Sequence, residues 1–433
     1  MSSKTKTTAT KDEATPALVP KLRFPQYREA EGWKSIPLSR LAIRAKQKNR
    51  DEKIDRVLTN SAEFGVVDQR DFFDKDIATQ GKLEGYYVVE LGSYVYNPRI
   101  SSTAPVGPIS KNKIGTGVMS PLYTVFKFKD DRNDFYEHFF KTTGWHAYMR
   151  QASSTGARHD RMAISSNDFM AMPLPVPSST EQQKIAECLS SVDELMAAQA
   201  RKVDTLKTHK KGLMQQLFPR DGETQPRLRF PEFQNAGEWK REPLGSLCAR
   251  IMDGTHFSPK SKEGPRPYLT SKNIKDGRID LSNLSYISEE EHAEIYRKCP
   301  VKLHDVLLTK DGANTGNCAL NNLDFEFSLL SSVAVLRGNP SKLCQEFLFQ
   351  SILSDSVQSL ITESMSGQAI TRITLAKIGG FTIPVTSPGE QQRIASCLSS
   401  LDALITAETQ KLEALKTHKK GLMQQLFPSS EEE

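Results

Sequence analysis

The sequence lacks any apolar run near the roughly 20 residues that a membrane-spanning helix needs. It also lacks a secretory signal, because residues 1–17 are rich in Lys, Thr, Ser and Ala and contain no apolar core. Its six cysteines include no CxxC pair and no histidine-rich neighbourhood, which argues against the common zinc and thiol–disulfide motifs. We expect reduced, packed cysteines in a cytoplasmic protein. They are Cys188, Cys248, Cys299, Cys318, Cys344 and Cys397.

Motifs that carry catalysis are scarce as well. No GxxxxGK[ST] loop is present, so an ATP-driven motor is not expected. A methyltransferase would need an Asn/Asp-Pro-Pro-aromatic turn, whereas the nearest match, Asn97-Pro98-Arg99, lacks the second proline and the aromatic residue. The histidines are scattered and assemble no nuclease or hydrolase site. The sequence therefore predicts a chain without a catalytic site, a metal site or a cofactor.

A long heptad pattern is present instead, and it occurs twice. From Glu181 to Pro219 and from Glu390 to Pro428, seam residues recur every three or four positions, which is typical of a long helix packed against another. Residues 206–219 recur letter for letter as 415–428, and each copy stops at a proline. Two unrelated amphipathic helices would also fit, but a matched pair buries both seams. The seams are Ile185, Leu189, Val192, Met196, Gln199, Val203, Leu206, Lys210, Leu213 and Leu217, then Ile394, Leu398, Leu401, Ile405, Glu408, Leu412, Leu415, Lys419, Leu422 and Leu426.

A second repeat opens each half of the chain. Lys21-Leu-Arg-Phe-Pro25 precedes Gly32-Trp33-Lys34, and Arg227-Leu-Arg-Phe-Pro231 precedes Glu238-Trp239-Lys240. The chain thus reads as two copies of one module, with an approximate two-fold relation between them. The expected order is a disordered tail at 1–20, a globular domain at 21–179, a long helix at 180–219, a linker at 220–226, a second globular domain at 227–388, a second long helix at 389–428 and a tail at 429–433.

Each half of the chain consists of a globular body and a frame, which is the opener motif and the long helix. The two bodies differ far more in sequence than the two frames do. Their expected elements nevertheless follow one order, which predicts two loop-rich α+β domains. Strands are expected at 92–99, 120–126 and 172–177 in the first body, and at 304–310, 331–336 and 381–385 in the second. One helix is expected in each body, at 135–149 and at 343–363. One frame that carries two different bodies suggests one scaffold with two binding surfaces.

Positive charge accumulates in the loops of both bodies, on a chain with net charge +6 and pI near 8.8. Lys and Arg neutralise backbone phosphates, and Arg, Asn and Ser can read base edges, so DNA binding is one interpretation. Solvated basic loops without a ligand are the other. The candidate DNA-binding residues are Tyr96, Asn97, Arg99, Lys111, Lys113, Arg158 and Arg161 in the first body, and His256, Lys260, Lys262, Arg266, Lys272, Lys310, Asn314 and Arg372 in the second.

Together these motifs resemble the specificity subunit of type I restriction–modification enzymes over nearly the whole chain. The most specific are the Leu-Arg-Phe-Pro opener, the helix start Glu-Gln-Gln-Lys/Arg-Ile-Ala and the repeated Leu-Lys-Thr-His-Lys-Lys-Gly-Leu-Met-Gln-Gln-Leu-Phe-Pro. Asp253-Gly-Thr-His256, Thr270-Ser-Lys-Asn-Ile274 and 115–123 also look like that family's target recognition domains.

The resemblance implies a fold and a set of partners. The fold would be α+β, with two target recognition domains joined by two long helices in an antiparallel coiled coil. Each domain would read one half of a bipartite site in double-stranded DNA. Two DNA-methylation subunits and two restriction/translocase subunits would supply the chemistry, and no membrane is involved. The alternatives are part of a single-chain restriction–methylation enzyme, a nuclease with an unrecognised site, and a coiled-coil adaptor that binds protein.

Overall fold

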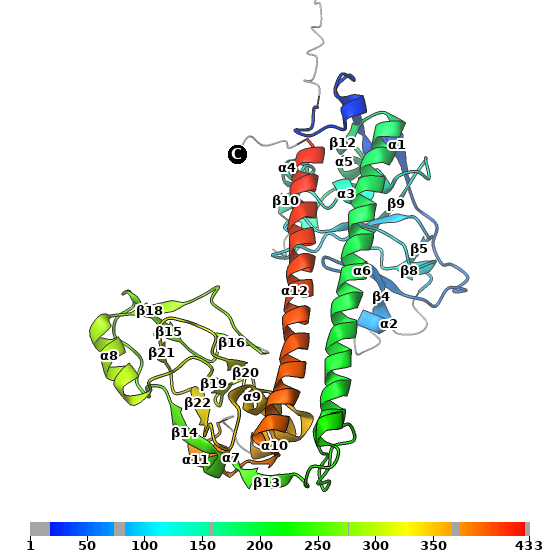
Figure 1. The fold of residues 1–433 in the computed structure, drawn as a ribbon. Helices are drawn as coiled ribbons and strands as arrows, with labels where there is room; N and C mark the ends of the chain where they lie inside the picture. The colour runs from blue at the N-terminus through cyan, green and yellow to red at the C-terminus, as the bar shows by residue number, and fades with distance from the viewer. Residues whose placement is uncertain (1–17, 73–82, 156–159, 276, 366–371, 429–433) are drawn as a thin grey trace, which may run out of the picture. The chain divides into compact units, whose positions relative to one another are not determined.

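A computed structural model describes residues 18–72, 83–155, 160–275, 277–365 and 372–428 (Figure 1). Of the disordered tail expected at 1–20, residues 1–17 lie outside the described residues, as does the tail at 429–433. The prediction is wrong for 18–20, because Leu18 forms a β-bridge with Trp33 and Pro20 is buried. The chain divides into two compact units, of which unit 1 comprises Met1–Ala198 and Leu412–Glu433, and unit 2 comprises Gln199–Lys411. Both units mix helices and strands. In the described ranges, no helix is long and apolar enough to cross a membrane.

Unit 1 is built on a four-stranded antiparallel sheet in the order β2-β9-β6-β7, with smaller pairs β1-β12, β3-β4, β5-β8 and β10-β11 around it. Its aromatic core includes Tyr94, Phe126 and Phe169, all fully buried. The strands are β1 (Lys34–Pro37), β2 (Ala42–Arg44), β3 (Leu58–Ser61), β4 (Gly65–Asp68), β5 (Tyr87–Val89), β6 (Tyr94–Tyr96), β7 (Ile109–Lys111), β8 (Gly117–Met119), β9 (Thr124–Phe128), β10 (Ser154–Thr155), β11 (Met162–Ala163) and β12 (Pro173–Val176). The short helices are η1 (Pro25–Tyr27), α1 (Leu38–Leu41), α2 (Gln69–Phe72), α3 (Asp134–Phe139), α4 (His146–Ala152) and α5 (Ser166–Met170).

Unit 2 contains a four-stranded sheet of matching antiparallel order, β14-β22-β19-β20, and a second sheet, β18-β15-β21. The strands are β13 (Lys240–Pro243), β14 (Cys248–Asp253), β15 (Arg266–Leu269), β16 (Ile274–Lys275), β17 (Arg278–Ile279), β18 (Ser285–Ile287), β19 (Val306–Thr309), β20 (Cys318–Leu320), β21 (Ser328–Leu329), β22 (Val333–Gly338) and β23 (Thr382–Val385). The short helices are η2 (Pro231–Phe233), α7 (Leu244–Leu247), α8 (Glu289–Lys298), α9 (Gln345–Leu353), α10 (Asp355–Met365) and α11 (Leu375–Gly380). Each body therefore has its own central sheet, and the two sheets have the same strand order despite the different sequences.

The single helix predicted in each body is wrong, because two helices occupy each range. Residues 135–149 are split between α3 and α4, where the hydroxyl of Thr142 bonds to the carbonyl of Phe139 and accepts from the amide of Gly144. Such local bonds compete with helix continuation. Residues 343–363 are split between α9 and α10 at Ser354, which has extended backbone and bonds back to Ser351.

The repeated opener motif has a structural cause. The guanidinium of Arg23 forms two hydrogen bonds of 2.8 Å with the carboxylate of Glu181, near the start of α6. In the second copy, Arg229 bonds to Glu390 at 2.7 and 2.8 Å near the start of α12. The Arg of each opener and the first Glu of each Glu-Gln-Gln motif thus form one buried ion pair. This pair fastens each opener to a long helix.

The two long helices are α6 (Ser179–Leu217) and α12 (Pro388–Leu426), each of 39 residues. A 39-residue helix is roughly 58 Å long at about 1.5 Å per residue. All residues of both predicted seams are buried or half-buried. In unit 1, Ile185 and Leu189 of α6 share a core with Leu426 of α12. In unit 2, Leu217 of α6 shares a core with Ile394 of α12.

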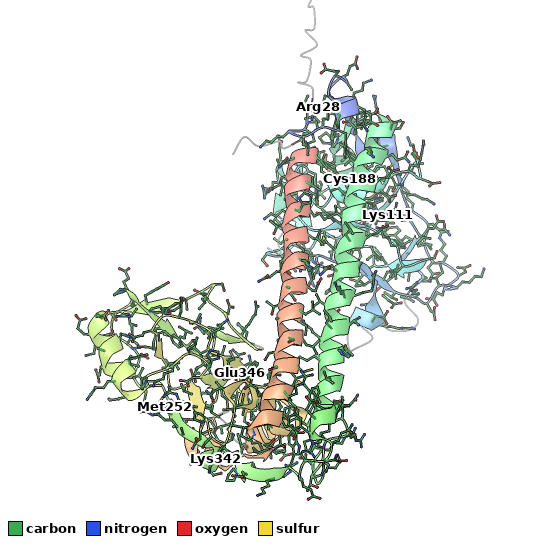
Figure 2. The ribbon with its side chains drawn as sticks, viewed as in Figure 1. Arg28, Lys111, Cys188, Met252, Lys342 and Glu346 are labelled. Carbon is green, nitrogen blue, oxygen red and sulfur yellow. The ribbon has the colours of Figure 1, made fainter. Side chains whose placement is uncertain are left out.

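The polar seam positions pair with one another. Lys419 bonds to both carboxylate oxygens of Asp193 at 2.5 and 2.6 Å in unit 1, and Lys210 bonds to Asp402 at 2.7 and 2.8 Å in unit 2. Equivalent residues of the two copies are 209 positions apart, so Asp193 is equivalent to Asp402 and Lys210 to Lys419. The same ion pair therefore occurs twice. Cys188, labelled in Figure 2, lies on α6 and is half-buried.

One polar position pairs with its own counterpart. Gln199 and Glu408 are equivalent in the repeat, and the amide of Gln199 donates to the carboxylate of Glu408 at 2.6 Å and to its backbone carbonyl at 2.8 Å. Lys202 and Lys411, also equivalent, contact the other carboxylate oxygen at 3.1 and 2.9 Å. The hydrogen bonds from Gln199, Lys411 and Lys202 lower the pKa of Glu408 to about 2. We call these four residues the central polar cluster.

Candidate nucleic-acid interface

In unit 2, the loop that follows strand β19 meets the chain just before α11. The amide of Ile373 donates to the carbonyl of Lys310 at 2.9 Å, and Asp311 forms a β-bridge with Arg372. We call this contact the unit 2 junction. Gly312 and Gly316 have positive φ of 88° and 101°, which favours glycine and turns the loop sharply. The side chain of Arg372 is exposed there, 3.7 Å from the carboxylate of Asp311.

Unit 1 contains the same junction at the end of strand β6. The amide of Met162 donates to the carbonyl of Pro98 at 2.9 Å, and Arg99 forms a β-bridge with Arg161. Both guanidinium groups lie near Asp160, at 3.9 and 3.7 Å. Arg161 and Arg372 thus hold the same place in the two units, each shortly before the helix α5 or α11. The structure brings these predicted residues together although they are far apart in the sequence.

Two residues predicted to contact DNA, Tyr96 and Lys310, are buried in the structure. Tyr96 donates its hydroxyl to the carbonyl of Val106 at 3.0 Å and stacks on Phe169, and its burial raises the pKa of the phenol. All three residues of β6 are buried, so an alternation of buried and exposed positions could not show which of its side chains face the core. Lys310 is buried with its ammonium group 3.3 Å from Asp253 and 3.7 Å from Asp311.

Lys310 links two other candidates through these aspartates. Asp253 also lies 3.4 Å from the exposed ring of His256, while Asp311 faces the exposed guanidinium of Arg372. The buried lysine therefore fixes the two carboxylates that sit behind two exposed, potentially cationic side chains. Lys310 was predicted to contact DNA, and the structure places its ammonium group beside two carboxylates. Asn314, in the same loop, is half-buried and its carbonyl accepts from Asn317.

Several predicted cations are already neutralised by neighbouring carboxylates. Lys111, drawn in the body of unit 1 in Figure 2, bonds to Asp134 at 2.7 Å, and Lys113 lies 2.8 Å from Glu137. Arg266 forms two 2.7 Å bonds with Glu289, and this contact raises the pKa of the guanidinium. These three residues stabilise loops and helices and are weaker candidates for phosphate contacts.

The remaining candidates are exposed or shape turns. Asn97 donates to the carbonyl of Asn60 and accepts from the amide of Arg99, so it orients the unit 1 junction. Arg158 lies outside the described residues. The side chains of three lysines in unit 2 are exposed on the loops between β14 and β15 and between β15 and β16, namely Lys260, Lys262 and Lys272.

Some exposed bases were missed by the sequence reading. Lys46, Lys48 and Arg50 are exposed or half-buried on the segment that follows β2 in unit 1. Their alternation with uncharged residues is visible in the sequence and was a usable signal. Arg278, on the hairpin of β16 and β17 in unit 2, contributed to the predicted positive charge of the second body without being a candidate contact, and its side chain is exposed.

One arrangement in unit 2 has the residue types of a hydrolase. His292 lies 3.0 Å from the hydroxyl of Ser328 and 3.5 Å from the carboxylate of Glu326. Ser328 is fully buried, however, so its hydroxyl cannot meet a substrate in this conformation. A search of the described part of the chain found no cluster of three or more His, Cys, Asp or Glu suited to a metal ion.

Comparison with known proteins shows what this chain is similar to. Residues 237–417 match the type I restriction modification DNA specificity domain. The chain is 24% identical over 330 residues to the type I restriction enzyme MjaVIII specificity subunit of Methanocaldococcus jannaschii, which covers 74% of each protein. The crystal structure of a type I restriction–modification S subunit from M. genitalium has a TM-score of 0.59 at 14% identity, over 96% of this chain and 100% of that one. A chain from a structural study of type I R-M complex assembly and conformational transition has a TM-score of 0.53 at 16% identity, over 92% and 97%. These two structures show the shared fold.

Proposed function

We propose that each unit reads one half of a bipartite, asymmetric DNA site, because the chain is similar to the DNA specificity subunits of type I restriction–modification systems. The proposal assigns unit 1 and unit 2 to two target recognition domains. Residues 21–179 and 227–388 would form these domains, and the two long helices would form an antiparallel coiled coil between them.

The observation that carries the proposal is the repeated junction. The same amide-to-carbonyl bond occurs at Met162 and Ile373, and it presents Arg161 and Arg372 in equivalent places. The side chains around these two arginines differ, with Arg99 and Asp160 in one unit and Asp311 in the other. Equal scaffolds with unequal surroundings suit two base sequences, because side chains at base edges determine specificity.

The outer faces of the long helices support a second part of the proposal, the docking of methylation subunits. Leu195 of α6 and Leu404 of α12 hold equivalent positions and are 55% and 40% exposed. A single exposed leucine needs no explanation, but its recurrence at the same position of both helices supports a repeated protein contact. The same exposed residues surround each leucine, namely Ser191, Ala198 and Lys202 in one copy and Ser400, Ala407 and Lys411 in the other. Two like surfaces fit two copies of one methylation subunit, and two restriction/translocase subunits would complete the complex.

The decisive experiment maps methylated adenines in DNA from cells that express this chain with its methylation subunit. We expect one site composed of two unlike half-sites and a spacer of fixed length. DNA binding measured across a salt series should weaken with a log–log slope of roughly −5 for about six phosphate contacts. A slope near zero, together with salt-insensitive protein binding, would instead support a coiled-coil adaptor. Methyl transfer or cleavage by the purified chain alone would support a single-chain enzyme.

A further inference from the structure

A large groove runs through unit 2 between the long helices and the body. It has a volume of about 1220 Å³ and is lined by the second half of α6, the β16–β17 hairpin, α10 and the first half of α12. Amides, hydroxyls and some apolar side chains contribute to the lining. The charged residues in it are mostly basic, and these are Lys207, Lys210, Lys211, Arg220, Lys275 and Arg278.

Three carboxylates also line the groove, and each already has a partner. Asp402 accepts from Lys210 and from the amide of Gln350 at 2.8 Å. Asp355 accepts from Gln215 at 2.8 Å, and Asp221 accepts from Arg241 at 2.9 Å. Asp402 neutralises Lys210 and Asp355 lies 3.9 Å from Lys211, which leaves the four other basic side chains of the groove.

Four of the basic side chains keep their charge available. Across the ranges that the structure describes, Lys207, Arg220, Lys275 and Arg278 have no carboxylate within ion-pair distance. Asp280 lies near enough to Lys275 and Arg278 for their charges to lower its pKa, although its hydrogen bonds to Ser282 contribute more. Unpaired cations that face one groove favour an anionic ligand.

One lining residue of the groove belongs to the loop of the unit 2 junction. Asn317, which lines it, follows the glycine loop of the junction and donates to the carbonyl of Ile274 at 3.3 Å. On the opposite side, Gln358 of α10 donates to the carbonyl of Gly316 at 3.1 Å. The loop that carries the candidate base contacts thus forms one end of the basic groove. An anionic polymer that reaches the junction has a charged path along the groove.

We propose that this groove binds the sugar–phosphate backbone of the DNA that adjoins the half-site read by unit 2. The proposal rests on the proposed function. Lysine and arginine contact phosphates without regard to base sequence, so the groove contributes affinity and orientation while the junction contributes specificity. An acidic segment of a partner protein has similar chemistry, but the continuity with the junction favours DNA.

The test removes three unpaired charges and keeps polar side chains. In the full chain, Lys207→Gln, Lys275→Gln and Arg278→Gln are combined, and binding is measured on DNA with the mapped site and on unrelated DNA across a salt series. We expect affinity to fall by the same factor for both DNAs. The salt slope should become shallower by about 2.7, because each of the three phosphate contacts contributes about 0.9 to the slope.

A matched control removes the same number of charges from unit 2 outside the groove. Arg297→Gln, Lys298→Gln and Lys302→Gln change exposed bases that do not line it, and this variant should keep the wild-type slope. The single variant Lys207→Gln should reduce the slope by about 0.9, which guards against misfolding of the triple variant.

Three results would overturn one proposal or the other. If the groove variant and the control share the wild-type slope while site-specific binding persists, the groove does not bind DNA and the proposed function stands. Loss of methylation-subunit binding with unchanged DNA binding would overturn the inference in favour of an acidic protein partner. A wild-type chain that shows no salt-dependent DNA binding would refute the proposed function itself.

Discussion

Replacing Arg229 by methionine should destabilise unit 2 strongly. Arg229 forms two hydrogen bonds with Glu390, and the side chains of the two residues are only 7% and 1% exposed. The same guanidinium donates to the carbonyls of Ala236 and Gly237 at 2.8 and 3.0 Å. Methionine fills a similar volume but supplies no charge and no donor. The carboxylate of Glu390 would then stay buried without the arginine. Among the described residues, the hydroxyl of Thr386 is the side-chain group that would still donate a hydrogen bond to it.

The size of the effect follows from the burial of the pair. Removing one partner of a buried ion pair costs about 3–5 kcal/mol, because the other charge is left without compensation. Lysine at the same place keeps the charge but cannot form the bidentate contact with Glu390. Arg229→Lys should therefore lower the free energy of unfolding less than Arg229→Met does. Arg23→Met should have an effect of the same size in unit 1, since Arg23 and Glu181 are equally buried. The exposed pair of Arg393 and Glu232 is the control, and its loss should cost about 0–1 kcal/mol.

Urea unfolding followed by tryptophan fluorescence measures these effects unit by unit. The chain has three tryptophans, of which Trp239 lies in unit 2, while Trp33 and Trp145 lie in unit 1. A background with Trp33→Phe and Trp145→Phe reports on unit 2 alone. If Arg229→Met shifts the Trp239 transition no more than Arg393→Met does, the pair does not fasten the opener to the helix and the reasoning fails.

Four further outcomes are expected. A chain in which residues 248–388 also replace 42–179 should methylate a symmetric inverted repeat, and methylation of the parental site would contradict two reading units. Arg99→Ala or Arg372→Ala should relax one base position in one half-site at a cost of about 1–3 kcal/mol, measured by binding to DNA with single base changes. A heptad inserted into both long helices adds about 10 Å to each, so mapped sites should gain a spacer of about three base pairs. The lowered pKa of Glu408 stabilises the folded state above the unfolded pKa of 4.5, and this stability is lost as the pH falls towards 2. The free energy of unfolding, measured across an acid pH series, should therefore fall less steeply with pH in Glu408→Gln than in the wild type.

The frame was predictable from sequence because its signals are local. Heptad spacing specified both long helices, and the repeated motifs contain Arg23 and Glu181, although the contact between these two residues was not predicted. The bodies were less predictable, since their key contacts join distant segments. Nothing local pairs Pro98 with Met162 or shows that Lys310 faces two aspartates rather than solvent. Charge in a loop indicates an available cation only when the structure shows that no carboxylate neutralises it.

The central polar cluster shows why a duplicated frame cannot keep every residue identical. In the proposed antiparallel pair of equivalent helices, an off-centre residue meets a different residue of the other helix. Asp193 with Lys419 and Lys210 with Asp402 accordingly form the same favourable pair twice. At the centre, a residue meets its own counterpart. Two glutamates there would bring like charges together within a buried contact, whereas Gln199 donates to Glu408 and leaves one carboxylate for the two flanking lysines. The difference between Gln199 and Glu408 therefore satisfies a physical requirement that copying alone cannot meet, and it favours pairing of α6 with α12 over pairing of α12 with a second α12.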